Sequence, residues 1–183
     1  MKFSELEIPG VWLIEPDLVC DNRGVFRRHF CAREFSARGL AVSVAQANVS
    51  ENPYLHTLRG FHYQLAPYSE GKTISCLMGG LYDIVVDLRP ESRCYLQWVA
   101  VSIDATNRAS LHVPAGCANA YLTMQENTIV HYYMSEFYVP ESYRGFRYDD
   151  PNFDFRWPAT PKVISIKDQN LPAYRDAKTQ GGV

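Results

Sequence analysis

Short segments in which apolar and polar residues alternate, each followed by turn residues, recur along most of this 183-residue chain. Alternation with a period of two is typical of half-buried β-strands. Strands this short and this closely spaced predict an antiparallel sandwich or barrel. In the second half of the chain, segments of this kind are Leu96–Ile103, Ala109–Val113, Ala118–Met124 and Thr128–Ser135.

The rest of the chain fits the same architecture. Cys31–Leu40 is the only segment with a helical pattern, and Gly39 near its end suits a helix C-terminus. The tail between residues 148 and 161 is expected to be irregular and packed on the body. Further strands are expected at Gly10–Ile14, which would be the first, at Val25–Phe30 and at Val163–Ile166.

Two adjacent glycines separate two strong strand patterns. Thr73–Met78 precedes Gly79-Gly80, and Leu81–Asp87 follows it. Two apolar runs separated by two glycines predict a β-hairpin with a two-residue turn.

Composition excludes several classes of partner. The net charge of −2 and the sequence pI of about 6.2 give no broad positive field for nucleic acid. Leu81–Leu88, the longest apolar stretch, is far shorter than the roughly 20 residues that span a bilayer.

The acidic first residues do not fit a secretory signal. The five cysteines include no C-x-x-C pair, which predicts free thiols, buried or half-buried. We expect one domain, residues 1–183, in the cytoplasm, without nucleic-acid or membrane partners.

The segment Leu58–Gln64 places one histidine among cations. It alternates like a strand, so Arg59, Phe61 and Tyr63 are expected on the face opposite His62. Lys72 follows shortly after. Histidine is the side chain best suited to move a proton near neutral pH, and flanking cations suit an anion site. These residues alone leave open a structural histidine in a barrel wall.

A metal site requires more ligands than the sequence offers. Metal-binding barrels of this type use an H-x-H segment and a later histidine after P-x-G. Here the first segment is His62-Tyr63-Gln64, and the later position is Asn119. Since a first-row metal normally takes three or more strong ligands, we expect none, and a metal-dependent enzyme is kept as an alternative.

Many segments together resemble the dTDP-4-dehydrorhamnose 3,5-epimerase family from Ile8 to Asp176. The resemblance implies an all-β cupin jelly-roll barrel with short peripheral helices. The matching segments, in order, are Ile14–Pro16, Asp21–Phe26, Gln46–Ser50, Leu58–Gln64, Gly71–Lys72, Tyr82–Arg89, Pro114–Gly116, Tyr132, Tyr138–Pro140, Arg147–Pro151 and Ser165–Asp168.

The resemblance implies a cofactor-free isomerase that inverts carbon 3, carbon 5 or both of a nucleotide-linked 4-keto-6-deoxy sugar. His62 matches the general base that removes a proton next to the ketone, and Asp168 matches the carboxylate that orients it. Tyr132 matches the general acid on the opposite face of the ring. Lys72 matches the cation at the 4-keto oxygen, where negative charge develops.

The same resemblance implies a nucleotide-diphospho-sugar substrate and a homodimer. Arg23 and Arg59 match contacts to the diphosphate, whose oxygens suit the planar guanidinium fork. Gln46 and Asn48 match nucleotide contacts. Phe26 matches an aromatic residue that covers the base from a neighbouring subunit.

Three binding positions depart from the family pattern. Arg28 and Tyr143 stand where the family usually has glutamate, and Asn119 stands where it usually has histidine. Tyr138 is a further candidate for the sugar pocket. Because an arginine only donates hydrogen bonds where a glutamate only accepts them, we expect these changes to alter the substrate. A non-catalytic sugar-nucleotide-binding cupin is the remaining alternative.

Overall fold

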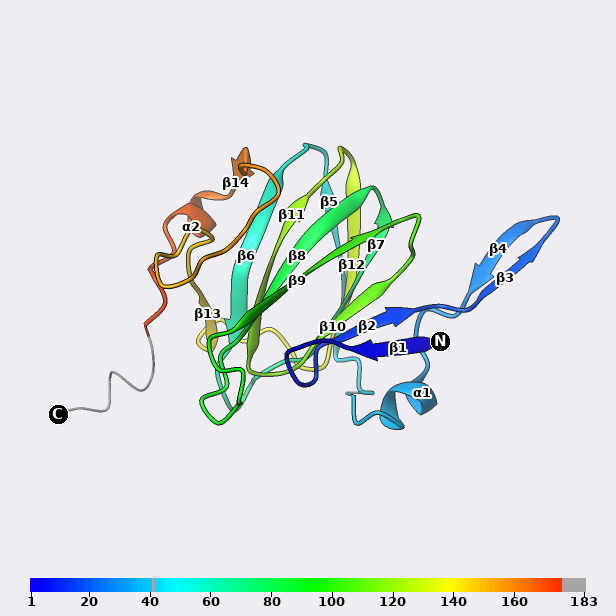
Figure 1. Cartoon of the computed structure of the whole chain (residues 1–183), viewed down its shortest axis with the longest axis horizontal. Coiled ribbons are helices and arrows are strands. Elements are labelled where there is room, and N and C mark those ends of the chain that lie inside the picture. The colour runs from blue at the N-terminus through cyan, green and yellow to red at the C-terminus, as the bar shows by residue number, and fades with distance from the viewer. Residues whose placement is uncertain (41, 176–183) are drawn as a thin grey trace.

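The computed structural model describes residues 1–40 and 42–175, and it is almost entirely β (Figure 1). Two sheets face each other and form a flattened barrel, with the strands of both sheets running along its walls. The first sheet contains, in spatial order, β1 (Lys2–Glu5), β2 (Trp12–Glu15), β10 (Ser110–Val113), β7 (Lys72–Met78), β12 (Thr128–Met134) and β5 (Gln46–Asn52). This confirms the all-β class expected from the alternating pattern.

The second sheet forms the opposite wall. Its strands, in spatial order, are β13 (Tyr143–Gly145), β6 (Thr57–Gln64), β11 (Cys117–Thr123), β8 (Gly80–Asp87) and β9 (Trp98–Asp104), with β14 (Val163–Ile164) added in parallel to β6. Every other strand pair in the described part of the chain is antiparallel, as expected for a jelly roll.

The prediction of a β-hairpin at Gly79-Gly80 is wrong. Strand β7 pairs with β10 and β12 in the first sheet, whereas β8 pairs with β11 and β9 in the second. The chain therefore crosses from one wall to the other at this point. Gly79 has a φ of +78° and lies against Thr128, so a side chain there would collide with Thr128. The two glycines allow a tight connection between the two sheets. The local sequence of such a connection does not differ from that of a hairpin turn.

The start of the chain also differs from expectation. A strand, β1, precedes the predicted first one, which begins at Trp12 rather than Gly10. The strand expected to reach Phe30 ends at Arg27, as β4 (Gly24–Arg27). Helix α1 (Ala32–Ser36) lies inside the predicted helical segment, and Gly39 just after it has a φ of +69°.

Strands β3 (Leu18–Asp21) and β4 form a hairpin that projects from the barrel, at the right of Figure 1. Its apolar side chains are unusually exposed: Phe26 is 70% exposed and Val19 60%. Cys20 on the same hairpin is an exposed free thiol, although we expected buried or half-buried cysteines. No helix in the described residues is long and apolar enough to cross a membrane.

One part of the hydrophobic core lies between the walls, and a second part lies outside the second sheet. Inside, Val11, Val85, Leu111 and Val130 are fully buried in one cluster. Outside, Phe61 packs in a second cluster with aromatic residues of the irregular tail. This confirms that residues 148–161 are irregular and packed on the body. The expected single domain includes residues 41 and 176–183, which lie outside the described part.

Candidate active site

A cavity of about 730 Å³ opens between the two sheets and holds most of the predicted site residues. Strands β5, β7 and β12 form one wall, and β6, β11 and β13 form the other. The predicted residues that line it are Gln46, Asn48, Arg59, His62, Lys72, Asn119, Tyr132, Tyr138, Tyr143 and Asp168.

His62 and Asp168 form a hydrogen-bonded pair in this cavity. The distance from His62 Nε2 to Asp168 Oδ1 is 2.8 Å. Asp168 is fixed in turn by helix α2 (Ile166–Gln169), where its backbone N–H donates to the capping hydroxyl of Ser165 at 3.0 Å. An ionised Asp168 keeps the proton on Nε2, which leaves the lone pair of His62 on Nδ1.

The two groups have pKa values suited to this arrangement. Burial raises the pKa of Asp168, but hydrogen bonds from His62 and from the Gly60 N–H outweigh it, so the net pKa is lowered. Burial lowers the pKa of His62, an effect that Asp168 partly offsets and that Lys72 reinforces. At neutral pH the pair is therefore a neutral imidazole on a carboxylate, the form in which histidine accepts a proton.

Strand β6 presents both His62 and Arg59 to the cavity, which corrects the expectation that they lie on opposite faces. Asn119 pairs with His62 and Tyr121 with Arg59, so Gly60 and Phe61 together oppose the single residue between those partners. This is a β-bulge, and it shifts the alternation by one residue. Phe61 and Tyr63 do lie on the other side, in the outer aromatic cluster, as predicted.

Lys72 and Asn119 lie in the polar end of the cavity. The Lys72 ammonium donates to the His62 carbonyl oxygen at 3.1 Å and to Asn119 Oδ1 at 3.3 Å. Asn119 Nδ2 donates to both oxygens of Asp83, each at 3.2 Å. Asp83 is fully buried, and burial raises its pKa to about 8, although the Asn119 amide opposes that shift. Both ends of the Asn119 amide are thus held in one orientation.

Tyrosines complete the cavity around His62. Tyr132, on β12, belongs to the wall opposite His62, and burial raises the pKa of its phenol while Arg59 lowers it. Tyr143 lies with its ring centre 5.2 Å from that of His62 and 5.3 Å from that of Tyr138. Burial raises the pKa of Tyr143, and Asp168 adds to the shift. The Tyr132 and Tyr143 phenols are therefore protonated at neutral pH.

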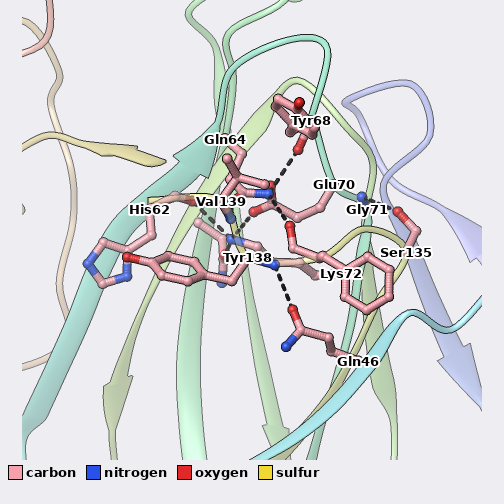
Figure 2. A network of polar contacts seen from close by, with 12 residues as sticks. Gln46, His62, Gln64, Tyr68, Glu70, Gly71, Lys72, Ser135, Tyr138 and Val139 are labelled. Atoms are coloured by element: carbon pink, nitrogen blue, oxygen red, sulfur yellow. Dashed lines mark hydrogen bonds and ion pairs between the residues drawn. The ribbon is translucent and has the colours of Figure 1, made fainter. Parts of the chain in front are cut away.

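Two glutamine side chains hold the segment that carries Tyr138 (Figure 2). The Tyr138 N–H donates to Gln46 Oε1 at 2.6 Å, and the Val139 N–H donates to Gln64 Oε1 at 2.7 Å. Gln64 Nε2 donates to the Phe137 carbonyl oxygen at 3.0 Å. Gln46, predicted as a nucleotide contact, thus anchors this segment.

Three predicted residues lie away from the cavity. Arg23 and Phe26 are on the projecting hairpin, where Arg23 forms an ion pair with Asp21. Arg28 follows this hairpin and lies 3.4 Å from Glu34 of α1. Within one chain, therefore, none of the three lines the cavity that holds His62.

Comparison with known proteins gives the family. The family profile described as dTDP-4-dehydrorhamnose 3,5-epimerase matches residues 5–176. The chain belongs to this family. A dTDP-4-dehydrorhamnose 3,5-epimerase from Sinorhizobium fredii is 37% identical over 174 residues, which cover 94% of this chain and 89% of the relative. The family assignment confirms the resemblance and the cupin-type fold, and it makes the protein an isomerase.

Solved structures of the epimerase family superpose closely on this chain. The enzyme from Bacillus anthracis, solved with TDP and pyrophosphate, has a TM-score of 0.91 at 34% identity, covering 94% of this chain and 99% of the other. A 3′-monoepimerase from Streptomyces bikiniensis, in complex with dTDP-quinovose, has a TM-score of 0.87 at 31% identity, covering 96% and 89%. The similar structures thus include a protein described as acting at one centre.

Two charged residues of this epimerase cavity were not predicted. Lys167 lines it, with its ammonium 4.2 Å above the centre of the Tyr143 ring. Its position beside Asp168 in a matching segment was a usable signal. Glu70 also lines it, 3.2 Å from Lys72. Glu70 lies two residues before Lys72 in a loop, where no strand pattern predicts its direction. In the described residues, no group of three His, Cys, Asp or Glu side chains is placed to hold a metal.

Proposed function

We propose that this protein epimerises a nucleotide-linked 4-keto-6-deoxy sugar at carbon 3, carbon 5 or both, without a cofactor. The observation that carries the proposal is the His62–Asp168 pair, which lies in a cavity whose opposite wall bears Tyr132. Inversion of a carbon next to a ketone requires a base on one face and an acid on the other. Two opposed proton carriers on separate sheets meet this requirement.

The proposed reaction begins with proton removal by His62. Its Nδ1 lone pair takes the proton from the carbon next to the ketone, and the electrons of that C–H bond form an enolate with the charge on oxygen. Lys72 stabilises this oxygen, since a preorganised cation in a buried site acts most strongly where charge develops. Tyr132 then gives its phenolic proton to the other face of the same carbon, which inverts that centre.

We propose that the open side of the cavity binds the nucleotide diphosphate. Arg59 and Lys167 supply two exposed cations there, and Gln46 and Asn48 supply polar groups for the base. The nucleotide diphosphate bound to the Bacillus anthracis relative supports this ligand class. Arginine and lysine are the side chains that best match phosphate oxygens.

We propose that the chain works as a homodimer in which the β3–β4 hairpin reaches a second copy. An isolated hairpin with exposed Val19, Val25 and Phe26 is not stable in water by itself. Burial of these side chains against a neighbour would be favourable. It would also explain why Arg23 and Phe26, both predicted substrate contacts, lie away from the cavity of their own chain.

We propose that Asn119 and Tyr143 shift the preference away from dTDP-4-keto-6-deoxyglucose. Both line the cavity, and Tyr143 places an apolar ring beside His62. A site with altered donors and acceptors rejects a ligand whose buried groups stay unpaired, at roughly 1–3 kcal/mol for each group. Arg28, which follows the β3–β4 hairpin, can share this role only if this part of the chain serves a neighbouring subunit. The location of the protein in the cytoplasm, a separate point, stays a prediction.

The test is solvent exchange with a panel of substrates. Candidate 4-keto-6-deoxy sugars linked to dTDP, CDP, UDP and GDP are incubated with the protein in deuterated water, and deuterium at carbons 3 and 5 is followed by NMR. Exchange with at least one supports the proposal, and the preferred nucleotide tests the claim about Asn119 and Tyr143. Calorimetric binding without any exchange would favour the non-catalytic binding module instead.

A further inference from the structure

The Lys72 ammonium has two hydrogen-bond acceptors and one anion beside it. The His62 carbonyl oxygen accepts at 3.1 Å, and Glu70 Oε1 lies at 3.2 Å (Figure 2). Asn119 Oδ1 accepts at 3.3 Å. Two of the three N–H donors of the ammonium are thus engaged in hydrogen bonds, which leaves one for an oxygen of a bound ligand. Lys72 itself is only 9% exposed.

Glu70 is the one charged member of these three groups. The carbonyl of His62 and the amide of Asn119 are neutral, and the Asp83 carboxyl accepts hydrogen bonds from Asn119 rather than from Lys72. A buried ammonium without an anion beside it is costly, because burial disfavours the charged form. Glu70 is therefore the counter-ion that lies against Lys72 in this end of the cavity.

The burial of Glu70 is costly and so requires an explanation. Its side chain is 3% exposed, and its Oε2 atom is buried without a hydrogen-bond partner among the described residues. An ion pair that served stability alone would have both carboxylate oxygens satisfied, since an unpaired buried acceptor destabilises the fold. A cost of this kind in a cavity wall is the pattern expected of a group kept for function.

The backbone around Glu70 fixes its direction. The next residue, Gly71, donates its N–H to Ser135 Oγ at 2.8 Å and accepts from the Ser135 N–H at 3.0 Å. Lys72 then begins β7, in register with Met134 of β12. Both partners of the ion pair are thus anchored to the wall that carries Tyr132.

We propose that Glu70 is a positioning residue that holds the Lys72 ammonium in place for the reacting carbonyl oxygen. The inference rests on the proposed function, in which Lys72 stabilises the enolate. Glu70 does not touch the reacting atoms. It acts on the step in which charge develops, so its loss affects turnover rather than the binding of the nucleotide.

The experiment compares Glu70→Gln with the wild-type protein and with Glu141→Gln, the same change at an exposed glutamate. Turnover and KM are measured on the substrate that the exchange screen selects, and binding of the nucleoside diphosphate alone is measured by calorimetry. For Glu70→Gln we expect kcat to fall at least fivefold, with KM and nucleotide affinity each within threefold of wild type. Glu141→Gln should match wild type in all three.

Any other pattern contradicts the inference. A smaller fall in kcat, a rise in KM without a fall in kcat, or an equal loss in Glu141→Gln would show that Glu70 does not act through Lys72. A Glu70→Gln protein that no longer folds would make Glu70 structural and would equally overturn the inference. If the wild-type protein catalyses no exchange on any nucleotide sugar, the proposed function itself fails, and the two failures are thereby distinguished.

Discussion

His62 gains its proposed role from its neighbours rather than from the imidazole itself. The 2.8 Å contact to Asp168 fixes the ring and its tautomer, and burial lowers its pKa so that Nδ1 is free at neutral pH. Lys72 lies close enough to reinforce this lowering. The same cation thus favours a neutral base and a stabilised enolate, two requirements of one reaction.

Tyr132 offers a test that separates the two proton transfers. Tyr132→Phe removes the proposed acid but leaves His62 and Lys72 in place. We expect formation of the inverted product to fall roughly 10²- to 10⁴-fold, the range for loss of a general acid. Deuterium exchange at the same carbon, with the configuration retained, should continue. NMR of one reaction mixture measures both, and an equal loss of exchange would show that Tyr132 is needed for proton removal as well.

The sequence identified ten of the residues that line the cavity, but not all of them for the right reason. The matching segments located His62, Lys72 and Asp168, whose chemistry can be read from residue type. Alternation misplaced Arg59, because a bulge at Gly60 is invisible to a period-two pattern. Glu70 was missed because its direction is set by the pairing of Gly71 with Ser135, a contact between distant parts of the chain.

The bulge in strand β6 determines which of its side chains face the cavity. A substitution at Gly60, which lies in the bulge, therefore tests this element. Gly60 has a φ of +119°, and a Cβ there would lie 2.6 Å from the Ala120 Cα. Gly24 has a φ of +123° with open space around it. We expect Gly60→Ala to lower the free energy of unfolding by about 1–3 kcal/mol more than Gly24→Ala, because only the first adds a clash to the backbone strain. Urea unfolding of both variants measures this, and equal losses would rule out the clash.

It was easier to predict which segments form strands than to predict which strands pair with each other. The alternating segments gave most strands of the two walls but not β1, β5 or β13, and the strands around Gly79 belong to different sheets. Helix α2, which fixes Asp168, was not expected, since four residues are too few for a helical period. Pairing depends on which faces bury apolar surface together, and that information is not local.

At the scale of the whole molecule, Asp83 should make stability depend on pH. Its carboxyl has a pKa of about 8 in the fold, against an ordinary value of 3.8. Between these values the folded state holds the extra proton, so the free energy of unfolding falls as pH rises from about 4 to about 8. Asparagine does not ionise, so in Asp83→Asn this decline should be smaller than in wild type. Urea unfolding at pH 5, 6.5 and 8 tests it, with exposed Asp154→Asn as the control. An unchanged pH slope in Asp83→Asn would contradict the assignment.

The proposed dimer makes a prediction for the projecting hairpin. Light scattering should give twice the chain mass, and Phe26→Ser should raise KM roughly three- to tenfold, as expected for loss of one aromatic contact. Turnover should change little, because Phe26 lies away from His62 of its own chain. An active monomer, or a Phe26→Ser variant with unchanged KM, would show that the hairpin does not serve a neighbouring site.

The most direct test of the account is hydrogen exchange catalysed by His62. The wild-type protein and His62→Ala are incubated with the preferred nucleotide-linked 4-keto-6-deoxy sugar in deuterated water, and deuterium at carbons 3 and 5 is measured by NMR. We predict incorporation at the inverted carbon with wild type, and a rate at least roughly 10²-fold lower with His62→Ala, as for loss of a general base. Exchange that persists at the wild-type rate in His62→Ala would contradict the account.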